Sequence, residues 1–341
     1  MLTEAQLRLV VGAGRTITKA VPGDKALGDL ANLPGTWANA GNLAGHGWNM
    51  IALPFKEPDR QIAGQISDFR LLLNQFNETL EFSIVDKGVP NRGAAFAEIF
   101  DRDQHLAALQ YVQAIEQIAA VDVPATADTP DTPKAAATIH HEPGLFLHLM
   151  SQTNGGPDVA RLATIPHGDA VLALGSGVLV KGAPDFDRIG DFSPLPVGVD
   201  ADVDNNPYLA PYKHFKTAPF NGLFDPTNPL ALLKAAINGI NIKSTTIITL
   251  DTSLLTGGIS NIPFVVKQAN ATAMRAIFWI EELEDLDAQG QPQFILQYAQ
   301  RVLLEFFPVG GASVGLIKWP HISINTMKRV AVPTVVNAGH S

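Results

Sequence analysis

Hydrophobic and polar residues alternate along much of this chain, with the period of a strand that has one buried face. In 79–85 every second residue is apolar, and in 293–307 the apolar face is interrupted by a single polar residue, Gln300. The opposite face of 293–307 carries polar side chains, including Gln297 and Glu305. The same pattern, with many β-branched residues, predicts strands at 138–150, 160–166, 170–180, 244–252, 272–283 and 319–329.

The predicted strands are joined by turn-forming sequence and not by helical pattern. The polar segment 285–291 connects two of the longest strands as a hairpin, and the 29 Gly and 24 Pro residues of the chain favour turns. We therefore predict a mainly β fold, an antiparallel closed β-barrel with long loop insertions and a few short helices, formed by one domain over 1–341. Closure would leave no exposed sheet edge.

Three segments lie outside the strand pattern. The first, 1–30, is predicted as an N-terminal helix and arm, because a capping-box sequence opens a helix over 4–11. The second, 122–137, is rich in Pro, Thr and Asp and is predicted as an exposed loop. The third, 182–240, is rich in Pro, Gly, Asp and Asn and is predicted as an inserted excursion with a short helix at 229–238.

Composition and charge exclude several classes of protein. The 341 residues include no cysteine, which excludes disulfides, thiolate metal sites and a cysteine nucleophile. With 24 Lys and Arg against 33 Asp and Glu, the net charge is −9, and no basic cluster stands out, so we expect no nucleic-acid partner. We find neither a signal peptide nor an apolar stretch of about 20 residues, which predicts a cytoplasmic protein with no membrane partner.

The chain contains no complete copy of common catalytic motifs such as the dinucleotide-binding loop. Gly12 and Gly14 follow an apolar run as in a dinucleotide-binding loop, but Ile17 stands where that motif has its third glycine. The carboxylates between Glu281 and Glu284 lie beside the predicted hairpin, and we interpret them as a solvated face. These segments therefore point to no reaction.

Histidine is the natural candidate for a metal or haem ligand in a chain without cysteine. His140 and Glu142 share one face of a predicted strand, because residues two apart in a strand point the same way. His167 lies at a predicted turn, and His321 lies at the start of the last predicted strand. A lone histidine in such a place is usually a hydrogen-bonding residue, so spacing alone establishes no metal site.

Three segments resemble the nitrobindin-like haem-binding β-barrels, which are related in shape to lipocalins. Leu33–Trp37 and the glycine-rich 45–49 resemble the opening strand of that family, 139–146 resembles its His-x-Glu-x-Gly strand, and 319–323 resembles its last strand. The chain is also similar, over most of its length, to a larger branch of bacterial and fungal haem-binding barrels. The resemblance implies a barrel of this type, enlarged here by long insertions.

The resemblance implies haem b (iron protoporphyrin IX) as the cofactor. Carried over to this sequence, His321 would be the proximal ligand of the iron and His140 the histidine on the opposite, distal side. His167 is the second choice for either role. Trp319 precedes His321 in the same motif and would contact the cofactor.

The resemblance also implies chemistry with a small oxidant, either peroxidase-like or like the isomerisation of peroxynitrite to nitrate. His140 would then move a proton between the oxygens of the oxidant, and Arg92 or Arg161 would stabilise the departing negative charge. The expected partners are haem and a small-molecule ligand or oxidant. Homo-oligomerisation stays open.

Two other functions fit a barrel of this kind. One is a metal-free, lipocalin-like carrier of a hydrophobic small molecule. The other is a non-haem metalloenzyme holding iron, zinc or manganese, for which His140, Glu142 and His167 are the candidate ligands. The residues alone leave these alternatives open, because a barrel does not fix a function.

Overall fold

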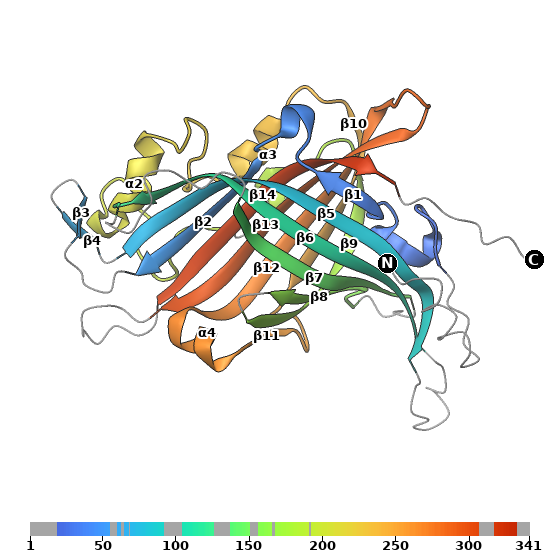
Figure 1. The fold of residues 1–341 in the computed structure, drawn as a ribbon, viewed down its shortest axis with the longest axis horizontal. Helices are drawn as coiled ribbons and strands as arrows, with labels where there is room; N and C mark the ends of the chain where they lie inside the picture. Colours follow the sequence, from blue (N-terminus) through green and yellow to red (C-terminus); the bar gives the residue numbers. More distant parts are fainter. Residues whose placement is uncertain are drawn as a thin grey trace, which may run out of the picture.

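The fold is known from a computed structural model (Figure 1). The structure describes residues 19–54, 60–62, 65–67, 69–91, 104–125, 137–150, 156–165, 168–190, 192–306 and 317–332. Most of these residues lie in long strands, and the helices are short.

The strands of the main sheet are β1 (Gly35–Ala38), β2 (Gly47–Pro54), β5 (Phe69–Asn91), β6 (Gln104–Val123), β7 (Ala137–Leu149), β8 (Val159–Ile165), β9 (Asp169–Lys181), β10 (Ile242–Asp251), β11 (Gly258–Asn261), β12 (Asn270–Leu286), β13 (Pro292–Phe306) and β14 (Ile317–Ala331). A separate two-stranded sheet contains β3 (Arg60–Ile62) and β4 (Gln65–Ser67). The helices are η1 (Lys25–Leu30), η2 (Gly41–Leu43), η3 (Phe186–Arg188), η4 (Pro207–Leu209), α2 (Ala210–Thr217), α3 (Leu230–Ala236) and α4 (Pro263–Gln268).

The main sheet closes into a ten-stranded antiparallel barrel. Its order is β14-β13-β12-β10-β9-β8-β7-β6-β5, and the two short strands β1 and β2 together occupy the tenth position. Both short strands pair with β5 on one side and with β14 on the other, which closes the ring. The predicted closed barrel is therefore confirmed, and closure satisfies the backbone groups that an open edge would expose.

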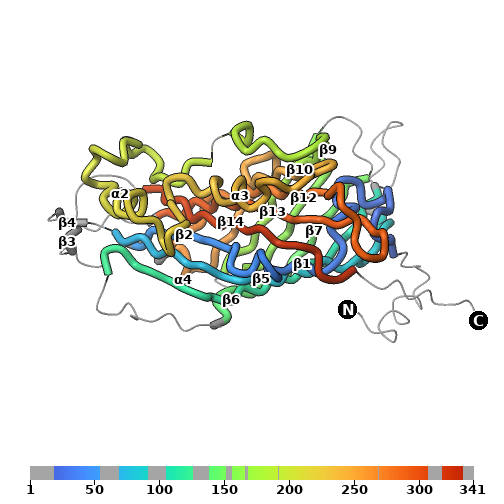
Figure 2. Tube along the Cα trace, turned by 90° about the horizontal axis from the view of Figure 1, so that it is seen from above, coloured from blue at the N-terminus to red at the C-terminus, as the bar shows by residue number. Residues whose placement is uncertain are grey.

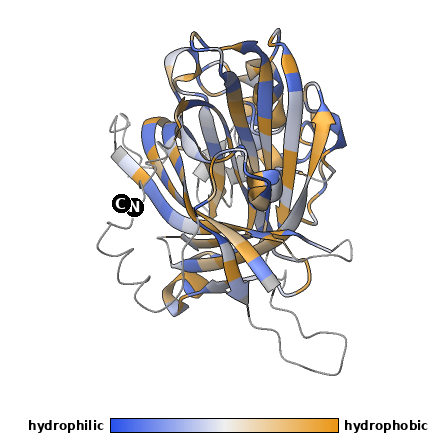
Figure 3. Ribbon diagram, turned by 90° about the vertical axis from the view of Figure 1, so that its right-hand side faces the viewer, coloured by the Kyte–Doolittle hydropathy of each residue, from blue (hydrophilic) through white to orange (hydrophobic). Residues whose placement is uncertain are grey.

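Alternation along the strands decides which side chains enter the barrel. On β13, Phe294, Leu296 and Tyr298 belong to the inner apolar cluster, as the sequence pattern predicts, whereas Gln297 lies on the outer face. Figure 3 displays the alternation as successive hydrophobic and hydrophilic bands along the strands. The inner cluster contains large aromatic residues from several strands, among them Phe146 and Phe278, whose ring centroids lie 5.5 Å apart. The inside of the barrel is therefore filled at this level.

A second apolar cluster lies mostly outside the barrel wall, although it also includes the cavity-lining residues Ala271 and Leu304. It forms where residues 182–190 and 192–241, here called the outer segment, pack against one side of the barrel (Figure 2). The outer segment contains α2 and α3. Trp48 of β2 contacts Phe220 and Phe224 of the outer segment, with ring centroids 5.9 and 5.5 Å away. Part of the outer face of the wall is therefore core and not surface.

Most of the predicted strands have counterparts in the structure, with one difference. The strand β6 has no counterpart in the sequence prediction, and it extends to Val123, so the predicted loop 122–137 begins later than expected. The predicted helix at 4–11 and the loop residues 126–136 lie outside the described residues. The short helix expected at 229–238 is α3.

The interpretation of Glu281 as solvated is wrong. Its side chain is fully buried on the outer face of β12, the same face as Trp279. Trp279 packs edge-on against Phe186 of the outer segment, with ring centroids 5.0 Å apart. The outer segment covers this part of the wall, so an outward position is not exposed here. Glu284, three residues further along, is exposed.

Candidate functional site

A cavity of about 350 Å³ lies inside the barrel, which is within the usual range of about 300–1,000 Å³ for small-molecule sites. Its wall is mostly apolar, with a few polar groups. The residues that line it are Ile51, His140, Glu142, Ile165, Asp169, Val171, Ile259, Phe264, Val265, Ala269, Ala271, Met274, Gln300, Val302, Leu304 and His321.

Two histidines predicted from the sequence meet in this cavity. His140 comes from β7 and His321 from β14. His321 is paired in register with Val302 of β13, whose side chain also lines the cavity, as does Leu304 two residues further along. The imidazole of His321 therefore lies in a largely aliphatic part of the wall.

Two other residues predicted for the site, Trp319 and Arg161, do not line the cavity. His167 and Arg92 are outside the described residues. Trp319 is buried but does not line the cavity. Its ring packs against Phe69 and Tyr208, at centroid distances of 4.5 and 6.0 Å, in the cluster beneath the outer segment.

Behind the cavity, Arg161 of β8 forms a buried ion pair with Glu142 of β7. Nη2 of Arg161 lies 2.7 Å from Oε1 of Glu142, and its Nε donates to the hydroxyl of Tyr111 at 3.1 Å. Tyr111 in turn donates a short hydrogen bond to Oε1 of Glu142. The guanidinium also lies 5.8 Å from the ring centroid of Phe146 and 5.7 Å from that of Phe278, where aromatic faces favour a cation.

A glycine makes room for this arrangement. A Cβ at Gly144 would lie 2.4 Å from Cε1 of Tyr111 and 2.3 Å from the carbonyl oxygen of Leu162. Only glycine lets the ring of Tyr111 cross the backbone of β7 so closely. The Pro143-Gly144 step inside a predicted strand therefore has a structural role at the site.

The charges of the ion pair are stable over a wide pH range. Burial raises the pKa of Glu142, but the charge of Arg161 and hydrogen bonds from His140, Tyr111 and Arg161 outweigh it and lower that pKa to about 2. For Arg161, burial opposes the charge, yet Tyr111 and Glu142 raise its pKa above the usual value. Near neutral pH the pair is fully ionised.

The ionised carboxylate fixes the proton of His140. Nε2 of His140 lies 3.2 Å from Oε2 of Glu142, and a carboxylate can only accept a hydrogen bond. Nε2 of His140 therefore carries a hydrogen and donates it to Glu142. This contact also holds the ring in one orientation at the cavity wall, as carboxylates do for functional histidines.

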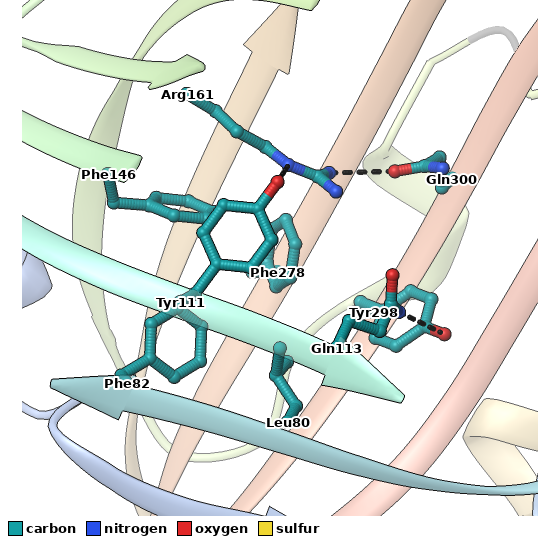
Figure 4. Close-up of a pocket in the computed structure, with 9 residues that line it drawn as sticks. All are labelled: Leu80, Phe82, Tyr111, Gln113, Phe146, Arg161, Phe278, Tyr298 and Gln300. Atoms are coloured by element: carbon teal, nitrogen blue, oxygen red, sulfur yellow. Dashed lines mark hydrogen bonds between the residues drawn. The ribbon is translucent and has the colours of Figure 1, made fainter. Parts of the chain in front are cut away.

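A second buried carboxylate, Glu78, is hydrogen-bonded to Tyr298 and Gln113, two residues that line a small void (Figure 4). Glu78 accepts hydrogen bonds from Tyr298 at 2.6 Å, from Asn325 at 2.8 Å and from Gln113 at 2.8 Å. Burial raises the pKa of Glu78 despite these hydrogen bonds. This void, whose polar lining residues are Tyr111, Gln113, Arg161, Tyr298 and Gln300, measures about 10 Å³, which is near the smallest volume, about 10–15 Å³, that holds one water molecule.

The sequence identified only part of this site. Gln300 stood out as the single polar residue on an apolar face, and it lines both the cavity and the small void. Tyr111 and Glu78 carried no such signal, because their partners come from strands far away in the sequence. Among the described residues, no group of three or more His, Asp or Glu side chains is arranged to hold a metal ion.

Comparison with known proteins adds little to this description. No protein-family model matches the chain. No curated protein matches it either. A crystal structure of Rv2717c from M. tuberculosis is similar at 14% sequence identity and a TM-score of 0.36, over 90% of this chain and 98% of that one. A likeness at this level identifies no family. Within the part of the chain that is described, no helix is long and apolar enough to cross a membrane.

Proposed function

We propose that this chain is a haem b-binding β-barrel in which His321 is the axial ligand of the iron and His140 faces the bound small molecule. One observation carries the proposal: these two imidazoles, from strands far apart in the sequence, line the same cavity in the barrel. The proposal also agrees with the resemblance of 139–146 and 319–323 to the nitrobindin-like barrels.

The histidine and the apolar part of the wall suit the iron and the faces of a haem, whereas the described lining offers no Lys or Arg to the two haem propionates. A histidine imidazole is a common protein ligand of haem iron, and His321 would hold the iron here. His321 supplies that imidazole from a wall that includes Val302, Leu304 and Met274, and apolar side chains suit the face of a porphyrin. A haem bound there would supply an iron centre able to react with small oxidants.

The residues around His140 prepare it for proton transfer. Glu142 accepts a hydrogen bond from Nε2 of His140 and stays ionised, so it stabilises the ring when the ring gains a second proton at Nδ1. Arg161 does not line the cavity, and it donates to Glu142, Tyr111 and Gln300. We therefore assign Arg161 as a positioning residue for Glu142 and not as a direct contact of the oxidant.

Titration of the purified protein with hemin tests the proposal. We expect a saturable Soret shift at one hemin per chain, lost in His321→Ala and retained in His140→Ala with altered reactivity toward peroxide. His141→Ala is the matched control, because His141 lies on the same strand but is exposed. If His321→Ala keeps the affinity and the spectrum while His140→Ala loses them, the assignment of His321 is wrong.

A metal-free carrier of a hydrophobic molecule is the second candidate, and the charges of the cavity favour it. The ionisable residues in the lining other than histidine are Glu142 and Asp169, and the described lining includes neither Lys nor Arg. A ligand with carboxylates would find no cationic side chain in this wall with which to form an ion pair. An uncharged hydrophobic ligand needs no such partner. Extraction of the purified protein with organic solvent and mass spectrometry distinguishes a bound lipid from haem.

A further inference from the structure

Gln300 connects the cavity with the buried ion pair behind it. The residue lies on the inner face of β13 and lines both the 350 Å³ cavity and the small void (Figure 4). Its Oε1 accepts a hydrogen bond from Nη1 of Arg161 at 2.7 Å.

This hydrogen bond fixes which end of the amide faces Arg161. A guanidinium has only donors, so the oxygen of Gln300, and not its nitrogen, must be the atom that contacts Arg161. Arg161 is itself held by Glu142 and Tyr111, so the amide cannot turn over without leaving a buried donor unpaired. The NH2 group of Gln300 is therefore left for the cavity, and within the described residues it has no hydrogen-bond partner.

The charges around this NH2 group decide which acceptor it suits. Glu142 also lines the cavity and lies close to Gln300, because both accept hydrogen bonds from the guanidinium of Arg161. Glu142 is ionised, and its charge is balanced by Arg161. A ligand carboxylate that approached Gln300 would also approach the carboxylate of Glu142 in a poorly solvated space. An uncharged oxygen accepts the hydrogen bond without that repulsion.

We infer that this cavity selects ligands that carry an uncharged oxygen acceptor, such as a ketone or amide carbonyl, and that Gln300 is the specificity-determining donor. The inference rests on the proposed function, because both take this cavity to be the ligand-binding site. It holds for a hydrophobic ligand with a carbonyl end and equally for a small oxygen-containing molecule. Arg161 is a positioning residue for Gln300 in either case.

Binding of matched probes to the haem-free, full-length protein tests the inference. The probes are 2-acetylnaphthalene, 2-ethylnaphthalene and 2-naphthoate, which share an apolar body and differ in the group that would meet Gln300. A neutral hydrogen bond corresponds to about fivefold in affinity, so we expect calorimetry to give that preference for the ketone over the hydrocarbon. We expect no preference for 2-naphthoate over the hydrocarbon.

Two variants remove the donor in different ways. Gln300→Met has a similar volume and no polar hydrogen, and Gln300→Glu keeps an oxygen for Arg161. Both should bind ketone and hydrocarbon equally, while their near-ultraviolet circular dichroism stays native. Val302→Ala is the control for the apolar wall. It should lower the affinity for the ketone and for the hydrocarbon alike, so the ratio of the two affinities should stay the same.

The outcomes separate this inference from the haem proposal when the same preparations are titrated with hemin. Loss of the ketone preference in both variants supports the inference, whether or not hemin binds. A ketone preference that survives in Gln300→Met and Gln300→Glu overturns it, even if hemin binds through His321. Absence of binding by all three probes, or a preference for 2-naphthoate, also overturns it.

Discussion

Arg161 and Glu142 form an ion pair inside the barrel, with 2.7 Å between Nη2 and Oε1 and with both side chains almost fully buried. A buried pair of this kind gains little over an apolar pair while it is intact, but the loss of one partner leaves an uncompensated charge. The pair also holds His140 and Gln300 at the cavity wall. Stability and the geometry of the candidate site therefore depend on the same contacts.

Removal of one partner should be costly. We expect Glu142→Gln to lower the free energy of unfolding by about 3–5 kcal/mol, because Arg161 stays buried without its counter-charge. Urea unfolding at neutral pH measures the loss. Lys243→Ala is the control, because Lys243 pairs with Glu282 at the surface and its removal should have little effect. A loss below about 1 kcal/mol in Glu142→Gln would mean that the pair is solvated.

The same pair predicts sensitivity to acid. The pKa of Glu142 is about 2 in the folded chain, below its ordinary value of 4.5. Its stabilising contribution is therefore present above the ordinary pKa and is lost as the pH falls through about 2. The difference in unfolding free energy between wild type and Glu142→Gln should shrink from pH 6 to pH 3. A constant difference over this range would contradict the assignment.

Glu281 predicts the opposite pH dependence. Burial on the outer face of β12 raises the pKa of Glu281 to about 8, and neither carboxylate oxygen has a hydrogen-bond partner among the described residues. The folded state is therefore penalised increasingly as the pH rises from about 4.5 to 8. Glu281→Gln should be more stable than wild type at pH 9, by about 1–3 kcal/mol, and similar to it at pH 5. Equal stabilities at both pH values would show that Glu281 is solvated.

The outer segment should contribute strongly to stability through its aromatic contacts. Phe224 is fully buried and stacks on Trp48 of the barrel. We expect Phe224→Ala to cost about 3–5 kcal/mol, as is typical for a large buried aromatic residue. The neighbouring Leu223 is exposed, so Leu223→Ala should change the melting temperature little. Similar effects of the two substitutions would mean that the outer segment does not pack as described.

The sequence predicted the barrel well where one face of a strand is uniformly apolar. Alternation in β13 identified the inner face and the exceptional Gln300. The strand β6 was missed because its inner face mixes Ala107, Leu109 and Tyr111 with the polar Gln113, so the contrast between its faces is weak. Burial of polar groups at such positions depends on partners from other strands, which no local pattern reveals.

Positions on the outer wall were predicted less well for a related reason. Alternation assigns Glu281 and Gln297 to the outward faces of their strands correctly, but both are fully buried. Gln297 donates to the carbonyl oxygen of Leu233 in α3 and to the hydroxyl of Thr326. The excursion was predicted as an insertion, but its docking on the barrel depends on contacts with Trp48 and Phe69 that spacing does not encode.

Chemical rescue of a ligand-deleted variant tests the central claim most directly. His321→Gly should bind hemin weakly and without the axial-imidazole spectrum, and addition of imidazole should restore both the affinity and the Soret band of the wild type. His141→Gly should behave as wild type with or without imidazole. A wild-type spectrum for His321→Gly in the absence of imidazole, or no saturable hemin binding by the wild type, would contradict a haem site at His321.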